Sequence, residues 1–117
     1  MTVLLLSLSC SREDEIPDGV LTKEEMIRAL LEIRTIEGQV ASLPINNDSA
    51  KFLYYLLEKR LFDSLDLDTA TWTRSFNYHI LKPDSFIDIT SVVIDSLKLR
   101  SQKLSAASPR QYNAIPK

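Results

Sequence analysis

Helix start and stop signals divide the apolar residues of this chain into four segments of helical spacing, and this pattern constrains the fold more than any other feature. At the first start, Thr22 and Glu25 are spaced as a capping box, in which each side chain binds the backbone amide of the other residue. Apolar residues then recur on one helical face, at Met26, Leu30, Ile33 and Val40. The pattern predicts a helix from about residue 23 to residue 41.

Two further helices follow from signals of the same kind. Asn46 is a good cap for a second helix, whose large apolar residues cover more than one stripe. We therefore expect this helix to lie centrally and to contact helices on two sides. Asp68 is a good cap for a third helix. Pro83 ends it, because proline lacks a backbone donor and biases the preceding residue away from helical geometry.

The fourth segment, which starts at Pro83, can be interpreted in two ways. Residues 87–94 are rich in β-branched side chains, which are typical of strands. A helical stripe nevertheless runs through Phe86, Val93 and Leu104, and a lone strand would have no partner elsewhere in the chain. We therefore predict an all-α fold, with one small domain of about four helices in two helical hairpins at residues 21–104. Residues 105–117 lack periodicity and are expected to form a flexible tail.

Cys10 is the only cysteine, and it follows a short apolar leader at residues 1–9. This arrangement predicts a lipoprotein signal peptide with lipid attachment at Cys10, because the processing peptidase needs an apolar stretch followed by small residues. Ser9 is small, but Leu8 is bulkier than usual, and no basic residue precedes the apolar stretch, so we expect the true start of the signal peptide to lie upstream. The alternative is a buried N-terminal segment with a free thiol.

Residues 10–20 are expected to form a lipidated acidic tether between the membrane and the helical domain. They are mostly charged, and Pro17 and Gly19 interrupt any regular structure. The tether and its lipid would make the membrane the first partner of the protein. No other apolar run approaches the ~20 residues that a membrane-spanning helix needs.

The composition argues against several kinds of site. Lys and Arg total 14 against 16 Asp and Glu, so the formal net charge of −2 offers no basic surplus for nucleic acid. A single histidine excludes a multi-histidine metal site, and the one cysteine is committed to lipid. Two glycines are too few for a phosphate-binding loop. We therefore expect no metal, no cofactor and no nucleic-acid partner.

Three polar residues are candidates for chemistry. Ser75 and His79 are one helical turn apart, a spacing that suggests a nucleophile and a base. Glu37 falls beside the apolar stripe of the first helix, where a buried carboxylate would need a partner. Arg60, Tyr78 or His79 could supply that partner. The alternative for His79 is a histidine packed in the core. The alternative for Glu37 is a carboxylate at the edge of the helix interface.

The aromatic residues between positions 52 and 86 are expected to lie mostly in the core, with a ligand platform as the alternative. A small helical domain needs large side chains to fill its core. If the protein binds a partner, we expect an exposed apolar patch or groove around Tyr54, Trp72 and Tyr78, with Glu37, Ser75 and His79 as its polar part. The aromatic set consists of Phe52, Tyr54, Tyr55, Phe62, Trp72, Phe76, Tyr78 and Phe86.

Three stretches of this chain carry a family resemblance, at residues 16–21, 30–38 and 72–83. Together they resemble a small helical lipoprotein domain of unknown function that is common in Bacteroidetes. That family typically shows an aromatic residue, a serine three positions later, an aromatic pair, a proline and an apolar helix. Trp72, Ser75, Tyr78 and Pro83 match this pattern, while His79 stands where a second tyrosine is usual. The resemblance implies a helical fold and a location in the cell envelope, but no activity.

The acidic run after Cys10 is similar to the export signal of Bacteroidetes lipoproteins that reach the cell surface. A solvated linker is the alternative, so the periplasmic face and the cell surface both remain open as locations on the outer membrane. The run consists of Ser11, Arg12, Glu13, Asp14 and Glu15.

These observations predict a membrane-anchored envelope lipoprotein that binds another protein or a peptide and is not an enzyme. One alternative is a hydrolase of envelope polymers, which requires Glu37, Ser75 and His79 to meet in a cleft. Another is a chaperone-like holder of outer-membrane clients, which would bind many peptides weakly.

Overall fold

The computed structural model describes residues 15–107 and contains four helices there. They are α1 (Lys23–Ala41), α2 (Asn47–Ser64), α3 (Thr69–Ile80) and α4 (Pro83–Ala107). The predicted all-α fold is confirmed, and residues 87–94 are helical. α4 continues past the predicted domain boundary at residue 104, and the predicted tail beyond Ala107 lies outside the described residues.

The predicted caps start the first three helices. Thr22 Oγ1 accepts the Glu25 amide at 3.2 Å, while the Thr22 amide donates to the Glu25 carboxylate at 2.8 Å, which completes the capping box. Asn46 and Asp68 each accept a first-turn amide through the side chain, at 2.8 and 2.6 Å. Local sequence therefore fixes where these helices begin.

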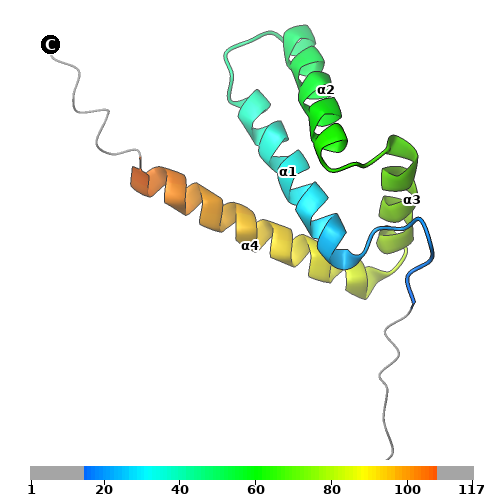
Figure 1. The fold of residues 1–117 in the computed structure, drawn as a ribbon. Helices are drawn as coiled ribbons and strands as arrows, with labels where there is room; N and C mark the ends of the chain where they lie inside the picture. Colours follow the sequence, from blue (N-terminus) through cyan, green and yellow to red (C-terminus); the bar gives the residue numbers. More distant parts are fainter. Residues whose placement is uncertain (1–14, 108–117) are drawn as a thin grey trace, which may run out of the picture.

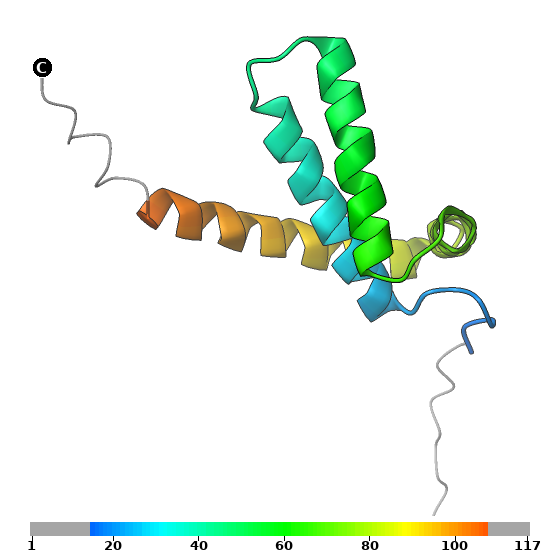
Figure 2. The same ribbon diagram turned by 45° about the horizontal axis from the view of Figure 1, so that its top comes forward.

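The central helix is α1, which makes the main contacts with both α2 and α4, while α3 packs against α4. Figure 1 shows α1 and α2 side by side as one hairpin, with α4 crossing α1 near its N-terminal end. In the turned view of Figure 2, α3 lies at the side of this crossing and is seen nearly end-on. The expectation that the second helix is central is wrong, because the main contacts of α2 are with α1 and its second apolar stripe faces solvent. Near its C-terminal end α2 also contacts α3, where Phe62 packs against Trp72.

The core forms where α1 crosses α4. Met26 and Ile89 are fully buried, and Leu30 and Val93 complete the cluster. Met26, Leu30 and Val93 belong to the predicted stripes of the first and fourth helices, so the stripes are confirmed at this crossing. Ile33 and Val40 are buried farther along α1, and Phe62 is buried near the end of α2, where it packs against Trp72.

The C-terminal half of α4 extends beyond the hairpin (Figure 1). Arg100 marks its last described polar contact with α1, donating to Glu32 at 2.6 Å and to Thr35 at 3.1 Å. Leu104 continues the apolar stripe but is 71 % exposed, because α4 has already passed α1 at this point. None of the helices within residues 15–107 is long and apolar enough to cross a membrane.

Candidate functional site

Ser75 and His79 lie in the core and hold the backbone of the N-terminal segment. The Leu21 amide donates to Ser75 Oγ at 2.9 Å, and the Leu21 carbonyl accepts from His79 Nε2 at 2.7 Å. Ser75 is 0 % exposed and His79 is 1 % exposed. Two side chains that lie one turn apart on α3 therefore bind both backbone polar groups of Leu21. Without them, burial would leave the Leu21 amide and carbonyl without hydrogen-bond partners. We call Leu21, Ser75 and His79 together the Leu21 clamp.

The remaining bonds of the Leu21 clamp are also satisfied. Ser75 Oγ donates back to the Thr71 carbonyl at 2.6 Å, a common arrangement for a serine within a helix. His79 Nδ1 lies 3.1 Å from the Ser85 hydroxyl. Because a carbonyl can only accept, His79 carries a proton on Nε2 and donates it to Leu21, while Nδ1 makes the second hydrogen bond of the ring, with the Ser85 hydroxyl. No buried side-chain nitrogen or oxygen within residues 15–107 lacks a partner.

The segment before α1 is not the free tether that the sequence predicts. Residues 16–20 lie against α3, where the Val20 amide donates to the Pro17 carbonyl at 3.2 Å and Arg74 donates to the Gly19 carbonyl at 3.3 Å. Gly19 has a φ of 78°, a conformation that suits glycine. Ile16 and Val20 are half-buried. Residues 16–21 therefore belong to the folded domain, because the clamp and these contacts bind them to α3.

Glu37, Ser75 and His79 do not come together. The Glu37 carboxylate accepts from Arg34 at 2.7 Å, one turn away on α1, so neither Arg60 nor a residue of α3 is its partner. Ser75 and His79 bind Leu21 rather than each other. The constellation that the hydrolase alternative requires is therefore not assembled by these three residues.

The aromatic candidates serve different parts of the structure. Trp72 is half-buried between Phe62 and Phe76, with ring centroids 6.1 and 5.9 Å apart, and is part of the packing around the core. Tyr54 is half-buried on α2, and its pKa is raised well above the usual range by burial, then by Glu58. The nearby charge of Glu37 acts in the same direction. The structure therefore does not place Tyr54 and Trp72 in one groove.

Tyr78 is half-buried beside the turn between α3 and α4. Lys82 Nζ donates to the Tyr78 hydroxyl at 2.8 Å and lies 4.6 Å from the centre of its ring. Tyr78 also packs edge-on against His79, with ring centroids 5.1 Å apart. Tyr78 therefore covers the outer side of the Leu21 clamp.

An exposed apolar face on α2 was not singled out from the sequence. Phe52 is 64 % exposed and Tyr55 is 61 % exposed, and Leu56 lies beside them. Their spacing of three and four residues places them on one side of the helix. In the sequence this face is visible as a second apolar stripe, and the stripe by itself predicts a contact with another helix. We call these three residues the α2 face.

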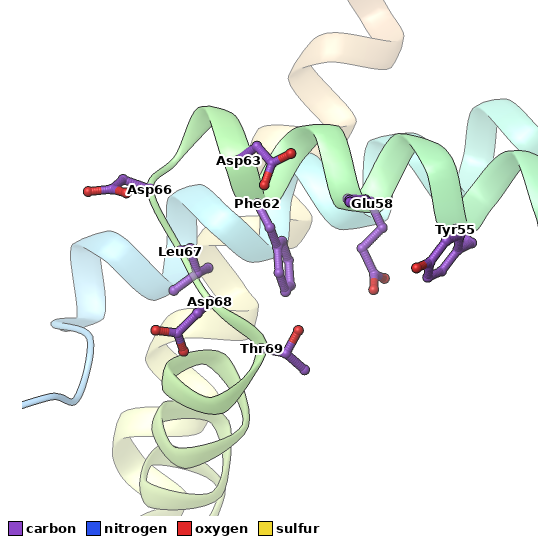
Figure 3. Close-up of a pocket in the computed structure, with 9 residues that line it drawn as sticks. Tyr55, Glu58, Phe62, Asp63, Asp66, Leu67, Asp68 and Thr69 are labelled. Atoms are coloured by element: carbon purple, nitrogen blue, oxygen red, sulfur yellow. The ribbon is translucent and has the colours of Figure 1, made fainter.

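A hollow of roughly 530 Å³ continues the α2 face toward the start of α3. Figure 3 shows Tyr55, Glu58 and Phe62 extending from α2 toward Thr69, whereas Asp66 points away from them. The hollow is acidic, since four carboxylates and one lysine line it. These residues are Glu58, Asp63, Asp66, Asp68 and Lys59.

Of the carboxylates that line this hollow, that of Asp68 has a structural role. Asp68 caps α3, and the amide of Thr71 that it accepts lowers the pKa of its carboxyl group. Within the described part of the chain, no three His, Cys, Asp or Glu residues are grouped so that they could hold a metal ion. The predicted lipid site Cys10 and residues 11–14 of the predicted export signal lie outside the described residues, and Glu15 is exposed at their edge.

The sequence of residues 17–103 matches the family described as "Domain of unknown function (DUF4296)". The chain belongs to the DUF4296 family. The match covers all of α1 to α3 and most of α4, together with the segment that the Leu21 clamp holds. No curated protein and no solved structure matches the chain. Membership of DUF4296 thus agrees with the predicted resemblance to a helical domain of unknown function, and it assigns no activity.

Proposed function

We propose that this DUF4296 protein is a lipoprotein of the bacterial cell envelope, attached to the outer membrane through Cys10. The leader at residues 1–9 and the small residue before Cys10 support this proposal. The matched domain begins at residue 17, so the family domain leaves Cys10 outside it as a separate attachment point. The resemblance to Bacteroidetes lipoproteins supports the same location.

Within the envelope, the protein binds another protein or a peptide and does not catalyse a reaction. The observation that carries this proposal is the α2 face, on which large apolar side chains at neighbouring positions remain exposed. Contiguous exposed apolar side chains mark interaction surfaces more often than the scattered ones that every protein carries. The acidic hollow beside the face favours a partner segment that is both apolar and basic.

The α2 face also lies on a suitable part of the molecule. Figures 1 and 2 both show the α1–α2 hairpin projecting away from the N-terminal end of the described chain, where the tether begins. A protein anchored at its N-terminus would therefore present this hairpin outward. Partner contacts would then not compete with the membrane for the same side of the domain.

The proposal is tested by crosslinking in intact cells that express the full chain. A double substitution, Phe52→Ser with Tyr55→Ser, removes the apolar side chains of the α2 face without touching the core. The matched control is Ile94→Ser with Leu99→Ser, which changes two exposed apolar residues of α4. We expect a partner crosslink that the first variant loses and the control retains. Equal loss or equal retention in both variants would count against the α2 face.

The anchor is tested separately by the Cys10→Ala substitution. We expect this variant to leave the membrane fraction and to stop incorporating labelled fatty acid. Continued labelling would show that Cys10 is not the lipid site. Protease treatment of intact cells then distinguishes the cell surface from the periplasmic face, because only a surface-exposed domain is cleaved. Crosslinking to many unrelated unfolded clients, instead of a defined partner, would favour a chaperone-like holder.

A further inference from the structure

We propose that the corner between α3 and α4, formed by Ile80 and Leu81, rests on the bilayer that holds the lipid of Cys10. The inference rests on the proposed anchor and adds a second membrane contact, made by the folded domain itself. We call these two residues the membrane corner.

The exit point of the tether is fixed. The Leu21 clamp binds both backbone polar groups of Leu21, and Arg74 binds the carbonyl of Gly19. The chain then continues to Ile16, which is half-buried and lines a surface hollow of roughly 920 Å³ together with Leu81. The beginning of the domain therefore lies on the same side of the molecule as Leu81 of the membrane corner.

The tether is too short to let the domain move far from the bilayer. Only residues 11–15 separate Cys10 from Ile16. A fully extended chain spans at most ~3.3–3.6 Å per residue, so Ile16 stays within about 20 Å of the lipidated cysteine. At this range the contact between the corner and the bilayer is effectively intramolecular, and a weak apolar contact becomes well populated.

The chemistry of the corner suits the interface of a bilayer. Leu81 is 81 % exposed, the highest value among the large apolar residues of the described part, and Ile80 beside it is 45 % exposed. Charge does not oppose the approach, since basic and acidic side chains balance around the adjacent hollow. These are Lys23, Lys82, Glu24 and Asp84.

This contact would also orient the rest of the domain. Figure 1 shows the turn between α3 and α4 near the N-terminal end of the described chain, while the loop of the α1–α2 hairpin lies at the opposite end. With the membrane corner on the bilayer, the hairpin points away from it. The α2 face is then held in the position that a partner can reach.

The experiment places a single tryptophan at the corner and measures its quenching by brominated lipids. Trp72 is the only tryptophan, so Trp72→Phe provides the background and retains an aromatic ring between Phe62 and Phe76. Leu81→Trp reports on the corner, and Phe52→Trp is the matched control on the α2 face. The full chain is coupled through the Cys10 thiol to a maleimide lipid in phosphatidylcholine vesicles.

We expect about half or more of the emission of the Leu81→Trp variant to be lost on vesicles with bromine near the headgroup end of the acyl chains, since interfacial side chains lie about 5–10 Å deep. The Phe52→Trp variant should keep its emission. Equal quenching of the two variants would overturn the proposal. Quenching that requires anionic lipid would also overturn it, because it would assign the contact to basic side chains instead of the apolar corner.

A second measurement covers the case in which Trp72→Phe disturbs folding. Hydrogen exchange of the coupled chain without tryptophan substitutions should slow across residues 78–85 when vesicles are present, and unchanged exchange there would refute the contact. Because the lipid is coupled chemically, neither result depends on whether cells acylate Cys10. The two proposals can therefore fail independently. Fatty-acid labelling tests the lipid anchor at Cys10, and quenching tests the bilayer contact of the membrane corner.

Discussion

Replacing Ser75 with alanine removes one side of the Leu21 clamp and leaves the Leu21 amide without its acceptor. An unsatisfied buried donor costs ~1–3 kcal/mol. Alanine in place of serine within a helix returns up to about 0.5 kcal/mol through its higher helix propensity. The expected net loss in the free energy of unfolding is therefore about 1.5 kcal/mol, near the middle of the resulting range.

The loss is measured by urea and thermal unfolding, followed through the fluorescence of Trp72 and the helical circular dichroism signal. In a domain of this size, about 1.5 kcal/mol corresponds to a decrease in Tm of roughly 6–12 °C. Ser91→Ala is the matched control, because Ser91 is an exposed serine in the interior of α4. It should leave the stability unchanged or raise it slightly.

A local probe separates the clamp from a general packing effect. Hydrogen exchange at the Leu21 amide should accelerate in Ser75→Ala more than exchange in the middle of α1. The double variant Ser75→Ala with His79→Leu should lose less than the sum of the two single variants, because both bonds hold the same residue. Additive losses, or a Ser75→Ala variant that unfolds like Ser91→Ala, would refute the clamp.

Three further predictions concern the helix ends and the contact between α1 and α4. Thr22→Ala should lower the free energy of unfolding by about 1 kcal/mol through loss of the capping box. Thr73→Ala, at an exposed helical position, is the control and should not lower it. Equal effects of the two substitutions in urea unfolding would argue against the cap. The lowered pKa of Asp68 in the folded state means that its carboxylate stabilises the fold above its ordinary pKa near 3.8, and this stabilisation is lost as the pH falls through the lowered folded value. Thermal unfolding of wild type and Asp68→Asn between pH 7 and pH 2 should therefore show a difference that disappears in acid, and a pH-independent difference would contradict the assignment. Arg100→Gln should cost about 0.5–1 kcal/mol, because its ion pair with Glu32 is partly exposed and screened, and the loss should shrink in high salt when unfolding is repeated there.

Local signals in the sequence were sufficient for the helices and their starts. The capping box at Thr22, the cap at Asp68 and the break at Pro83 act through hydrogen bonds and steric limits within a few residues. These interactions form in the same way whatever surrounds them. The helical stripe of the fourth segment likewise outweighed its β-branched residues, because burial of one face of α4 against α1 stabilises the helix.

The candidate site could not be predicted in the same way. The spacing of Ser75 and His79 is the same for a nucleophile and base as for two residues that bind a distant backbone. Only the position of Leu21, more than fifty residues away in sequence, distinguishes them. Similarly, the second stripe of α2 indicates an apolar face but not whether that face meets a helix, a partner or solvent.

The sequence by itself determined that the chain is helical, where each helix begins and that the one cysteine follows an apolar leader. These properties depend on neighbouring residues and on composition. Tertiary structure alone decided that α1 is central, that α2 keeps an exposed face, and that Ser75 and His79 hold the segment before α1. Those outcomes depend on which surfaces meet across long separations in the chain, and helical periodicity gives the direction of a face without naming what lies against it.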